Sequence, residues 1–121
     1  SEKNHVLYNI EKIEKNNKPV FLTEGELDTI RMVELGYNRS LALGGSDLGN
    51  RKWLLRDYTN QVILALDIDE AGMNAREKII KELYPLMNVS VINLPEGKDV
   101  GDITEQEELN RIIKNRKMYK G

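Results

Sequence analysis

The sequence predicts an α/β domain in three layers, with a four-stranded, mainly parallel sheet covered by helices on both faces. Short apolar runs alternate with segments whose apolar residues recur at helical spacing, a pattern typical of strand–helix units joined by right-handed crossovers. The chain has 121 residues, which suffices for one hydrophobic core but not for two. We therefore expect a single domain over residues 1–121, with its core at 18–105.

The N-terminal part is expected to hold one helix followed by the first strand–helix unit. Val6, Ile10 and Ile13 fall at helical spacing and predict a helix over 5–15. The first strand begins near Val20. The helix after it is indicated by apolar residues at three-residue intervals and by a glycine at the expected C-terminal cap, namely Leu27, Ile30, Val33 and Gly36.

Three further strands and three further helices are expected after residue 39. The strands are predicted at 40–43, 61–66 and 89–94. The helix after the second of these places Ala71, Ala75, Ile79 and Leu83 on one face. The final helix is predicted over 105–117, and its opening sequence Thr104-Glu105-Gln106-Glu107 fits a capping box.

Two aspartates follow the third strand, one residue apart. Side chains at positions i and i+2 point to the same side of a strand, so Asp67 and Asp69 can converge on one cation. Carboxylate oxygens suit the hard ions Mg²⁺ and Mn²⁺. The competing interpretation is that Asp67 and Asp69 are only loop and helix-capping residues, since aspartate is common before any helix.

Acidic residues also follow the first and the last strand. Glu24 and Asp28 lie in the turn and first helical residues after the first strand, and Asp99 and Asp102 follow the fourth. For Glu24 and Asp67 to meet, the first and third strands must be neighbours. The strand order 2-1-3-4 satisfies this condition and places the acidic residues at the topological switch point, beyond the carboxyl ends of the strands.

Three motifs in the chain resemble those of the Toprim family, in the family's order. They are E-G-x-x-D at Glu24 to Asp28, D-x-D-x-A-G at Asp67 to Gly72, and K-D-x-G-D at Lys98 to Asp102. The resemblance implies the Toprim (Rossmann-like) fold, general acid/base work for Glu24, and Mg²⁺ coordination by Asp67 and Asp69. It further implies that Asp28, Asp99 and Asp102 are the additional acidic residues of primase-type members, which we count among the candidate metal ligands.

Weaker signals concern phosphate and nucleic-acid contacts. Lys98 and the exposed amides of Gly44 and Gly45 are candidate phosphate contacts, although an ion pair for Lys98 and a tight turn for the glycines are the favoured explanations. Six basic residues could form a nucleic-acid track but are scattered, and solvated helix faces explain most of them: Arg31, Arg39, Arg51, Lys52, Arg56 and Arg76. We expect Trp53 to be partly buried beside Leu54 and Leu55 rather than stacked on a base.

Composition restricts the chemistry of the site. The chain has no cysteine and one histidine, His5, so neither a disulfide nor a zinc site is expected. Its formal net charge of −2 lacks the basic excess of a protein that grips DNA by itself, so Mg²⁺ or a neighbouring domain must supply positive charge. The absence of a transmembrane-length apolar run and of a signal-peptide pattern predicts a cytoplasmic protein with no membrane partner.

The resemblance implies the catalytic domain of a bacterial or phage-type DNA primase, an enzyme that makes RNA primers for DNA replication. It also implies that the chain is a fragment of that larger protein. The implied cofactor is Mg²⁺, with Mn²⁺ as a substitute. The implied partners are a single-stranded DNA template, nucleoside triphosphates, and the replicative helicase or neighbouring primase domains. The alternative is a stand-alone Toprim nuclease, of the overcoming-lysogenization-defect type or similar to a ribosomal-RNA maturase. A non-catalytic receiver-like module is the least favoured.

Overall fold

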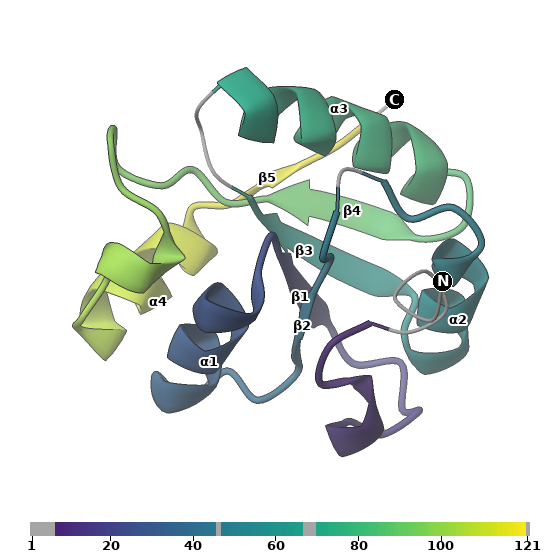
Figure 1. Cartoon of the computed structure of the whole chain (residues 1–121), viewed down its shortest axis with the longest axis horizontal. Helices are drawn as coiled ribbons and strands as arrows, with labels where there is room; N and C mark the ends of the chain where they lie inside the picture. The colour runs from purple at the N-terminus through teal and green to yellow at the C-terminus, as the bar shows by residue number, and fades with distance from the viewer. Residues whose placement is uncertain (1–6, 46, 67–69, 121) are drawn as a thin grey trace.

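The computed structural model describes residues 7–45, 47–66 and 70–120 of the chain (Figure 1). Its sheet has the strand order β2-β1-β3-β4-β5. The four parallel strands are β1 Val20–Thr23, β2 Ser40–Ala42, β3 Gln61–Ala65 and β4 Asn88–Val91. In register, Val20 of β1 pairs with Val62 of β3, and Phe21 pairs with Ser40 of β2. The predicted 2-1-3-4 order and the α/β class are therefore confirmed.

The C-terminal tail adds a fifth strand that the sequence analysis did not predict. The last helix, α4, covers Gln106–Lys114 rather than 105–117, and the chain then enters β5, Lys117–Met118. This strand pairs antiparallel with β4, and the backbone N–H of Tyr119 donates to the carbonyl of Val89 at 2.9 Å. The helix ends early because the tail can pair with the open edge of β4, a partner far away in the sequence.

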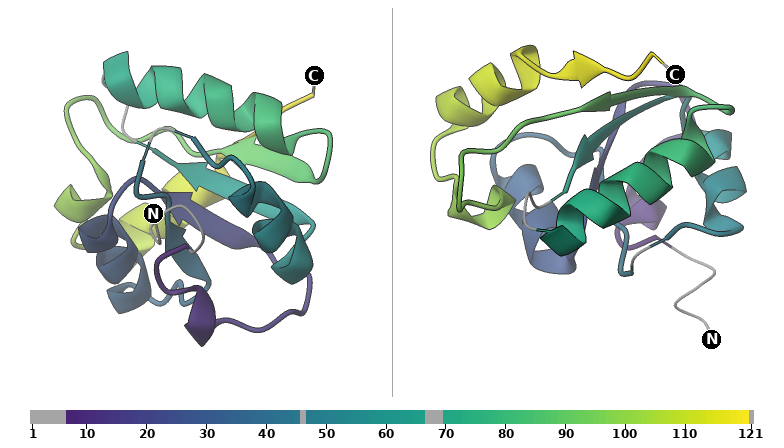
Figure 2. Two further views of the ribbon diagram at one scale, coloured as in Figure 1. Left: turned by 45° about the vertical axis from the view of Figure 1, so that its right-hand side comes forward. Right: turned by 90° about the horizontal axis from the view of Figure 1, so that it is seen from above.

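Two pairs of helices cover opposite faces of the sheet (Figure 2). α2, Arg51–Tyr58, and α3, Glu70–Leu83, pack on the face that contains Val20 and Leu22. α1, Glu26–Glu34, and α4 pack on the face that contains Phe21. Successive β1 side chains thus enter different halves of the core, which explains why all four residues of that strand are buried. Among the described residues, no helix combines the length and the apolar character needed to cross a membrane.

The N-terminal segment differs from the predicted helix over 5–15. In its described part, the only helical stretch is the 3-10 helix η2, Ile10–Lys12. Before it, Tyr8 forms an antiparallel bridge with Ala42, and the side-chain amide of Asn9 donates to the carbonyl of Ser40 at 3.0 Å. Asn9 has a φ of 75°, which is incompatible with a continuous right-handed helix. Of the apolar residues that suggested a helix, Ile10 is buried in the core and Ile13 packs against it, whereas Val6 lies outside the described residues.

Helix α1 buries a different face from the one that its apolar pattern suggests. Thr29 and Met32 are buried, whereas Leu27, Ile30 and Val33 are 80%, 42% and 38% exposed. The three-residue repeat correctly predicted a helix, but it identified the side that faces away from the sheet. Burial depends on where the helix docks, which periodicity does not specify.

Helix α1 ends at its C-cap Leu35, and the predicted cap glycine, Gly36, follows it in the left-handed conformation. Gly36 has a φ of 98°, its N–H donates to the carbonyl of Val33 at 3.0 Å, and the N–H of Tyr37 donates to that of Met32 at 2.9 Å. This pair of bonds is a Schellman motif. The side-chain amide of Gln106, from α4, donates to the carbonyl of Leu35 at 2.8 Å and so ties the ends of α1 and α4 together.

Candidate functional site

Acidic residues from two distant segments line one open cleft beside the end of β1. The cleft has a volume of about 670 Å³. Its lining consists of Glu24, Gly25, Glu26, Leu27, Asp28, Asp99, Gly101 and Asp102, and we call it the acidic cleft. Four of the predicted site residues, two from the first motif and two from the third, are therefore brought together by the fold.

The first half of the cleft is held by two threonines at the end of β1 and in α1. The hydroxyls of Thr23 and Thr29, both almost fully buried, are 2.8 Å apart, and the Thr23 hydroxyl also lies 3.1 Å from the carbonyl oxygen of Gly25. The carbonyl of Glu24 accepts a hydrogen bond from the N–H of Gly44 at 3.0 Å. The sequence analysis missed both threonines, although a polar residue ending an apolar strand was a usable signal.

The second half of the cleft is a short 3-10 helix, η3, Val100–Asp102, closed by a reciprocal capping box. The carboxylate of Asp99 accepts a hydrogen bond from the N–H of Asp102 at 3.1 Å, and the carboxylate of Asp102 accepts from the N–H of Asp99 at 2.9 Å. The predicted capping box of the last helix is not formed, because Glu105 is its N-cap and makes no side-chain cap bond. The reciprocal cap of η3 fixes the side chains of Asp99 and Asp102, the two aspartates of the third acidic motif.

Gly101 separates the two halves of the cleft at their closest approach. A methyl group placed on Gly101 would lie 3.1 Å from Oδ1 of Asp99 and 3.5 Å from Oδ1 of Asp28. The carboxylates of Asp28 and Asp99 therefore reach the same small volume from two different segments. Only a residue without a side chain leaves that space open, which gives the glycine of the K-D-x-G-D motif a physical role.

The remaining predicted site residues have different positions. Lys98 is exposed, and Gly44 and Gly45 are exposed with open space where a side chain would begin; none of the three lines the acidic cleft. Asp67 and Asp69 lie outside the described residues. Within residues 7–45, 47–66 and 70–120, no three histidine, cysteine, aspartate or glutamate residues are grouped closely enough to hold a metal ion. The carboxylate lining of the cleft is nevertheless the donor type that Mg²⁺ and Mn²⁺ prefer.

Two of the scattered arginines are structural. The guanidinium of Arg51 is buried and donates to the carbonyls of Leu43 at 2.6 Å, Asp47 at 2.8 Å and Leu48 at 3.4 Å, so it holds the loop after β2. Arg39 donates to backbone carbonyls of four residues, namely Glu14, Lys18, Pro19 and Tyr58. Both guanidinium groups are engaged by backbone carbonyls, so the solvated-face interpretation does not hold for these two arginines.

Arg76 in α3 is a partly buried residue whose guanidinium group has two buried nitrogen atoms. Among the described residues, its Nε and Nη2 atoms are buried and have no hydrogen-bond partner. Burial lowers the pKa of its guanidinium from the ordinary value. A buried donor without a partner costs free energy, so this position is a local source of instability.

Comparison with known proteins supports a family assignment. The Toprim-like family model matches residues 21–104. The DNA primase of Borreliella burgdorferi is 30% identical over 107 residues, which cover 84% of this chain and 20% of that protein. The Synechocystis DNA primase is 33% identical over 100 residues, or 76% of this chain and 16% of that protein. The chain thus spans about a fifth or less of the length of these curated relatives.

Solved structures agree with this assignment. The zinc-binding and RNA polymerase domains of the Aquifex aeolicus primase superpose with a TM-score of 0.85 at 28% identity, covering 97% of this chain and 31% of that one. A DnaG primase catalytic domain bound to single-stranded DNA superposes with a TM-score of 0.78 at 22% identity, covering 96% of this chain and 40% of that one. At this identity the similarity concerns the fold only. The chain belongs to the Toprim-like family, as a Toprim domain of the DnaG primase type.

Proposed function

We propose that this chain is the catalytic Toprim domain of a DNA primase and carries out metal-dependent nucleotidyl transfer, which builds RNA primers for DNA replication. One observation carries the proposal: the first and third acidic motifs meet in a single cleft at the carboxyl edge of a parallel sheet. Open α/β sheets bind their ligands at this edge. The primase relatives favour this function over the nuclease and the receiver-like module.

The residues have separate roles in this proposal. Glu24 is the general acid/base, because it lies at the β1 end of the cleft and its backbone is held by Gly44. Asp67 and Asp69 are the proposed principal metal ligands, as the motif resemblance implies, and Asp28 and Asp99 are proposed to add to them, since both carboxylates lie close to Gly101. When bound, Mg²⁺ or Mn²⁺ offsets charge on the phosphoryl group and lowers the pKa of the attacking hydroxyl.

Asp102 is assigned a positioning role rather than direct coordination. Its carboxylate accepts from the backbone N–H of Asp99 while its own N–H donates to the Asp99 carboxylate. Both bonds orient the Asp99 side chain toward Gly101 and Asp28. Loss of the Asp102 carboxylate should therefore act through Asp99, as ligand-orienting partners do in metal sites.

The partners follow from the reaction. A primase needs a single-stranded DNA template and nucleoside triphosphates, and we propose that neighbouring domains or the replicative helicase supply much of the template grip. The net charge of −2 supports this division of labour, since a cleft lined by carboxylates repels phosphates until cations are bound. Lys98 and the amides of Gly44 and Gly45 remain proposed phosphate contacts, and the cytoplasmic location remains part of the proposal.

The first experiment is a Mn²⁺ titration of the chain, followed by residue-resolved NMR line broadening. We expect the signals of Glu24, Asp28 and Asp99 to broaden first and together, with those of Asp67 and Asp69. Asp57→Asn, an exposed acidic residue of α2, is the matched control and should leave the pattern unchanged. Weak broadening spread over all surface acids would contradict a shared metal site.

A second experiment separates the primase from the nuclease alternative. The natural protein that contains this sequence is incubated with single-stranded DNA, ribonucleotides and Mg²⁺, and the products are separated by size. Templated ribonucleotide products of increasing length support primer synthesis. Shortened DNA without ribonucleotide addition contradicts it and supports a nuclease, which needs only water as the nucleophile.

A further inference from the structure

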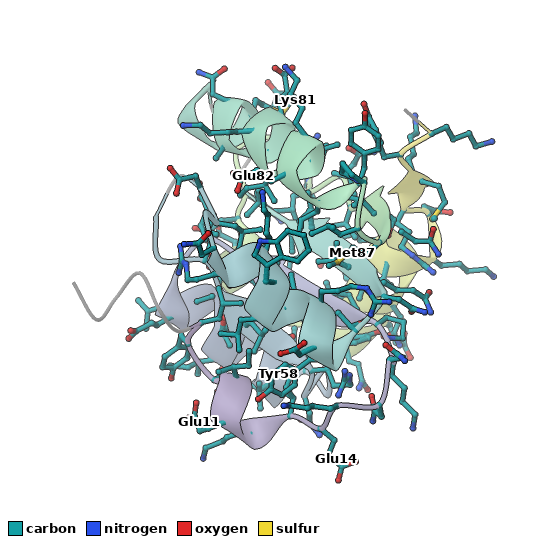
Figure 3. The ribbon with its side chains drawn as sticks, turned by 90° about the vertical axis from the view of Figure 1, so that its right-hand side faces the viewer. Glu11, Glu14, Tyr58, Lys81, Glu82 and Met87 are labelled. Carbon is teal, nitrogen blue, oxygen red and sulfur yellow. The ribbon has the colours of Figure 1, made fainter. Side chains whose placement is uncertain are left out.

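We propose that a second surface, between α2 and α3, binds single-stranded DNA by stacking a base on Trp53. A groove of about 710 Å³ lies there, and its lining includes Lys52, Trp53, Lys78, Lys81, Pro85 and Leu86. We call it the tryptophan groove. Figure 3 views the molecule from this side, with Lys81 and Glu82 of α3 above α2. The groove shares no lining residue with the acidic cleft.

Trp53 is available for stacking because it is outside the core. Its exposed fraction is 55%, whereas the adjacent Leu55 is fully buried and carries the apolar face of α2. The expectation that Trp53 is partly buried beside the leucines is therefore wrong: the helix turns Leu55 inward and Trp53 outward. An exposed indole flanked by Pro85 and Leu86 gives an apolar platform of the kind on which successive nucleic-acid bases stack.

The groove also has the charge that a nucleic-acid backbone requires. Lys52 lies with its Nζ 5.7 Å from the Trp53 ring centroid, and Lys78 and Lys81 come from the facing helix. The carboxylate of Glu82 is engaged by the backbone N–H groups of Leu48 and Gly49, at 3.4 and 2.9 Å. Lys78 forms an ion pair with Asp47, with 4.0 Å between Nζ and Oδ2. The lining as a whole holds three lysines and two carboxylates, an excess of one positive charge in a chain whose net charge is −2.

This local cationic excess around an aromatic side chain favours a single-stranded nucleic acid over an acidic peptide. A nucleic acid uses both features at each step, because every nucleotide offers a base face and a phosphate. An acidic peptide would use the lysines but has no flat group for the indole. The choice of DNA as the nucleic acid rests on the proposed primase function.

One loop connects the groove to the acidic cleft. The N–H of Gly44 donates to the carbonyl of Glu24 in the cleft, and Asp47 and Gly49, a few residues later, line the groove. Arg51 holds this loop through the carbonyls of Leu43, Asp47 and Leu48. The three peptide units from Gly44 to Asp47 span at most about 11 Å. This loop therefore links the backbone of Glu24 to the lining of the tryptophan groove.

The test uses intrinsic fluorescence, because Trp53 is the single tryptophan of the chain. A dT12 oligonucleotide is titrated at low salt without divalent metal, so that the acidic cleft does not take part. We expect saturable quenching with a dissociation constant of about 10⁻⁴ to 10⁻⁶ M, weakening as salt is added. Fluorescence anisotropy of labelled dT12 then measures DNA binding by variants that lack the indole. Trp53→Ala should bind dT12 about 5- to 100-fold more weakly than the unchanged chain.

Two lysine variants give the matched comparison. Lys81→Ala should lower the slope of log affinity against log salt by about 0.7, the value for one phosphate contact with a single strand. Lys114→Ala, an exposed lysine of α4 on the other face of the sheet, should leave affinity and slope unchanged. Circular dichroism checks that each variant is folded, which we expect because all three side chains lie on the surface.

The proposal is overturned if dT12 causes no quenching, or if Lys114→Ala weakens binding as much as Lys81→Ala. Quenching by a polyglutamate peptide, with none by dT12, would overturn it in favour of a peptide-docking groove. Failure of this proposal can be distinguished from failure of the proposed primase function, because the two experiments report different regions of the chain. Mn²⁺ broadening reports the acidic cleft and does not involve the groove, whereas dT12 quenching reports the groove and does not involve the metal site.

Discussion

The acidic cleft and the tryptophan groove differ in how the chain builds them. In the cleft, backbone groups orient the carboxylates: Asp99 and Asp102 cap each other, and the turn before Asp28 is held by buried threonines. In the groove, long side chains from two helices surround an exposed indole. A cleft with fixed carboxylates suits chemistry, which requires precise distances. A groove with adaptable lysines suits a polymer of varying sequence.

The largest expected effect tests whether chemistry is confined to the cleft. Glu24→Gln in the natural protein should lower the rate of primer synthesis by about 10²- to 10⁴-fold, because a general acid/base is removed while the shape is kept. The rate of ribonucleotide incorporation measures it. Glu26→Gln removes the same charge from the same cleft and should have a much smaller effect. Equal losses in both variants would mean that total charge, not Glu24, matters.

The next effect tests the loop that the two regions share. Arg51→Met should lower the free energy of unfolding by about 2–4 kcal/mol, because buried carbonyls of the loop lose their donor. Urea denaturation measures the change. The control is Arg56→Met, at an exposed arginine of the same helix. It should change the free energy of unfolding by less than about 0.5 kcal/mol. An unchanged stability for Arg51→Met would show that the loop is held by other contacts.

A smaller effect sharpens the contrast at the cleft. Gly101→Ala places a methyl group 3.1 Å from the carboxylate of Asp99, which must then shift by a few tenths of an ångström. We expect Mn²⁺ affinity, measured by NMR broadening, to fall about 10-fold, as for other displaced ligands. DNA binding in the groove should be unchanged. An unaltered Mn²⁺ affinity would separate Asp28 and Asp99 from the metal site.

The smallest effect concerns α3, the helix that supplies two lysines of the groove. Arg76→Met removes buried guanidinium atoms that have no partner among the described residues, and it keeps the length of the side chain. The free energy of unfolding should rise by about 1 kcal/mol. Thermal denaturation is the measurement, with the exposed Glu77→Gln as control. A loss of stability would indicate that Arg76 makes a contact outside the described residues.

Local patterns in the sequence determined much of this protein. Apolar runs located β1 to β4, Gly36 located a helix end, and the requirement that Glu24 meet the third-strand motif predicted the correct strand order. The grouping of Glu24, Asp28, Asp99 and Asp102 was also predicted, because strand ends in a parallel sheet share one edge. Asp67 and Asp69 lie outside the described residues, so their role as metal ligands stays a prediction.

Only the tertiary structure decided what packs against what. The apolar stripe of α1 is exposed, because α1 docks through Thr29 and Met32 instead. Trp53 faces outward and Arg51 inward, although both lie in the same turn of α2. β5 forms because a distant strand offers an open edge. Periodicity reports that a helix or strand forms, but burial and pairing depend on partners far along the chain, which no local pattern contains.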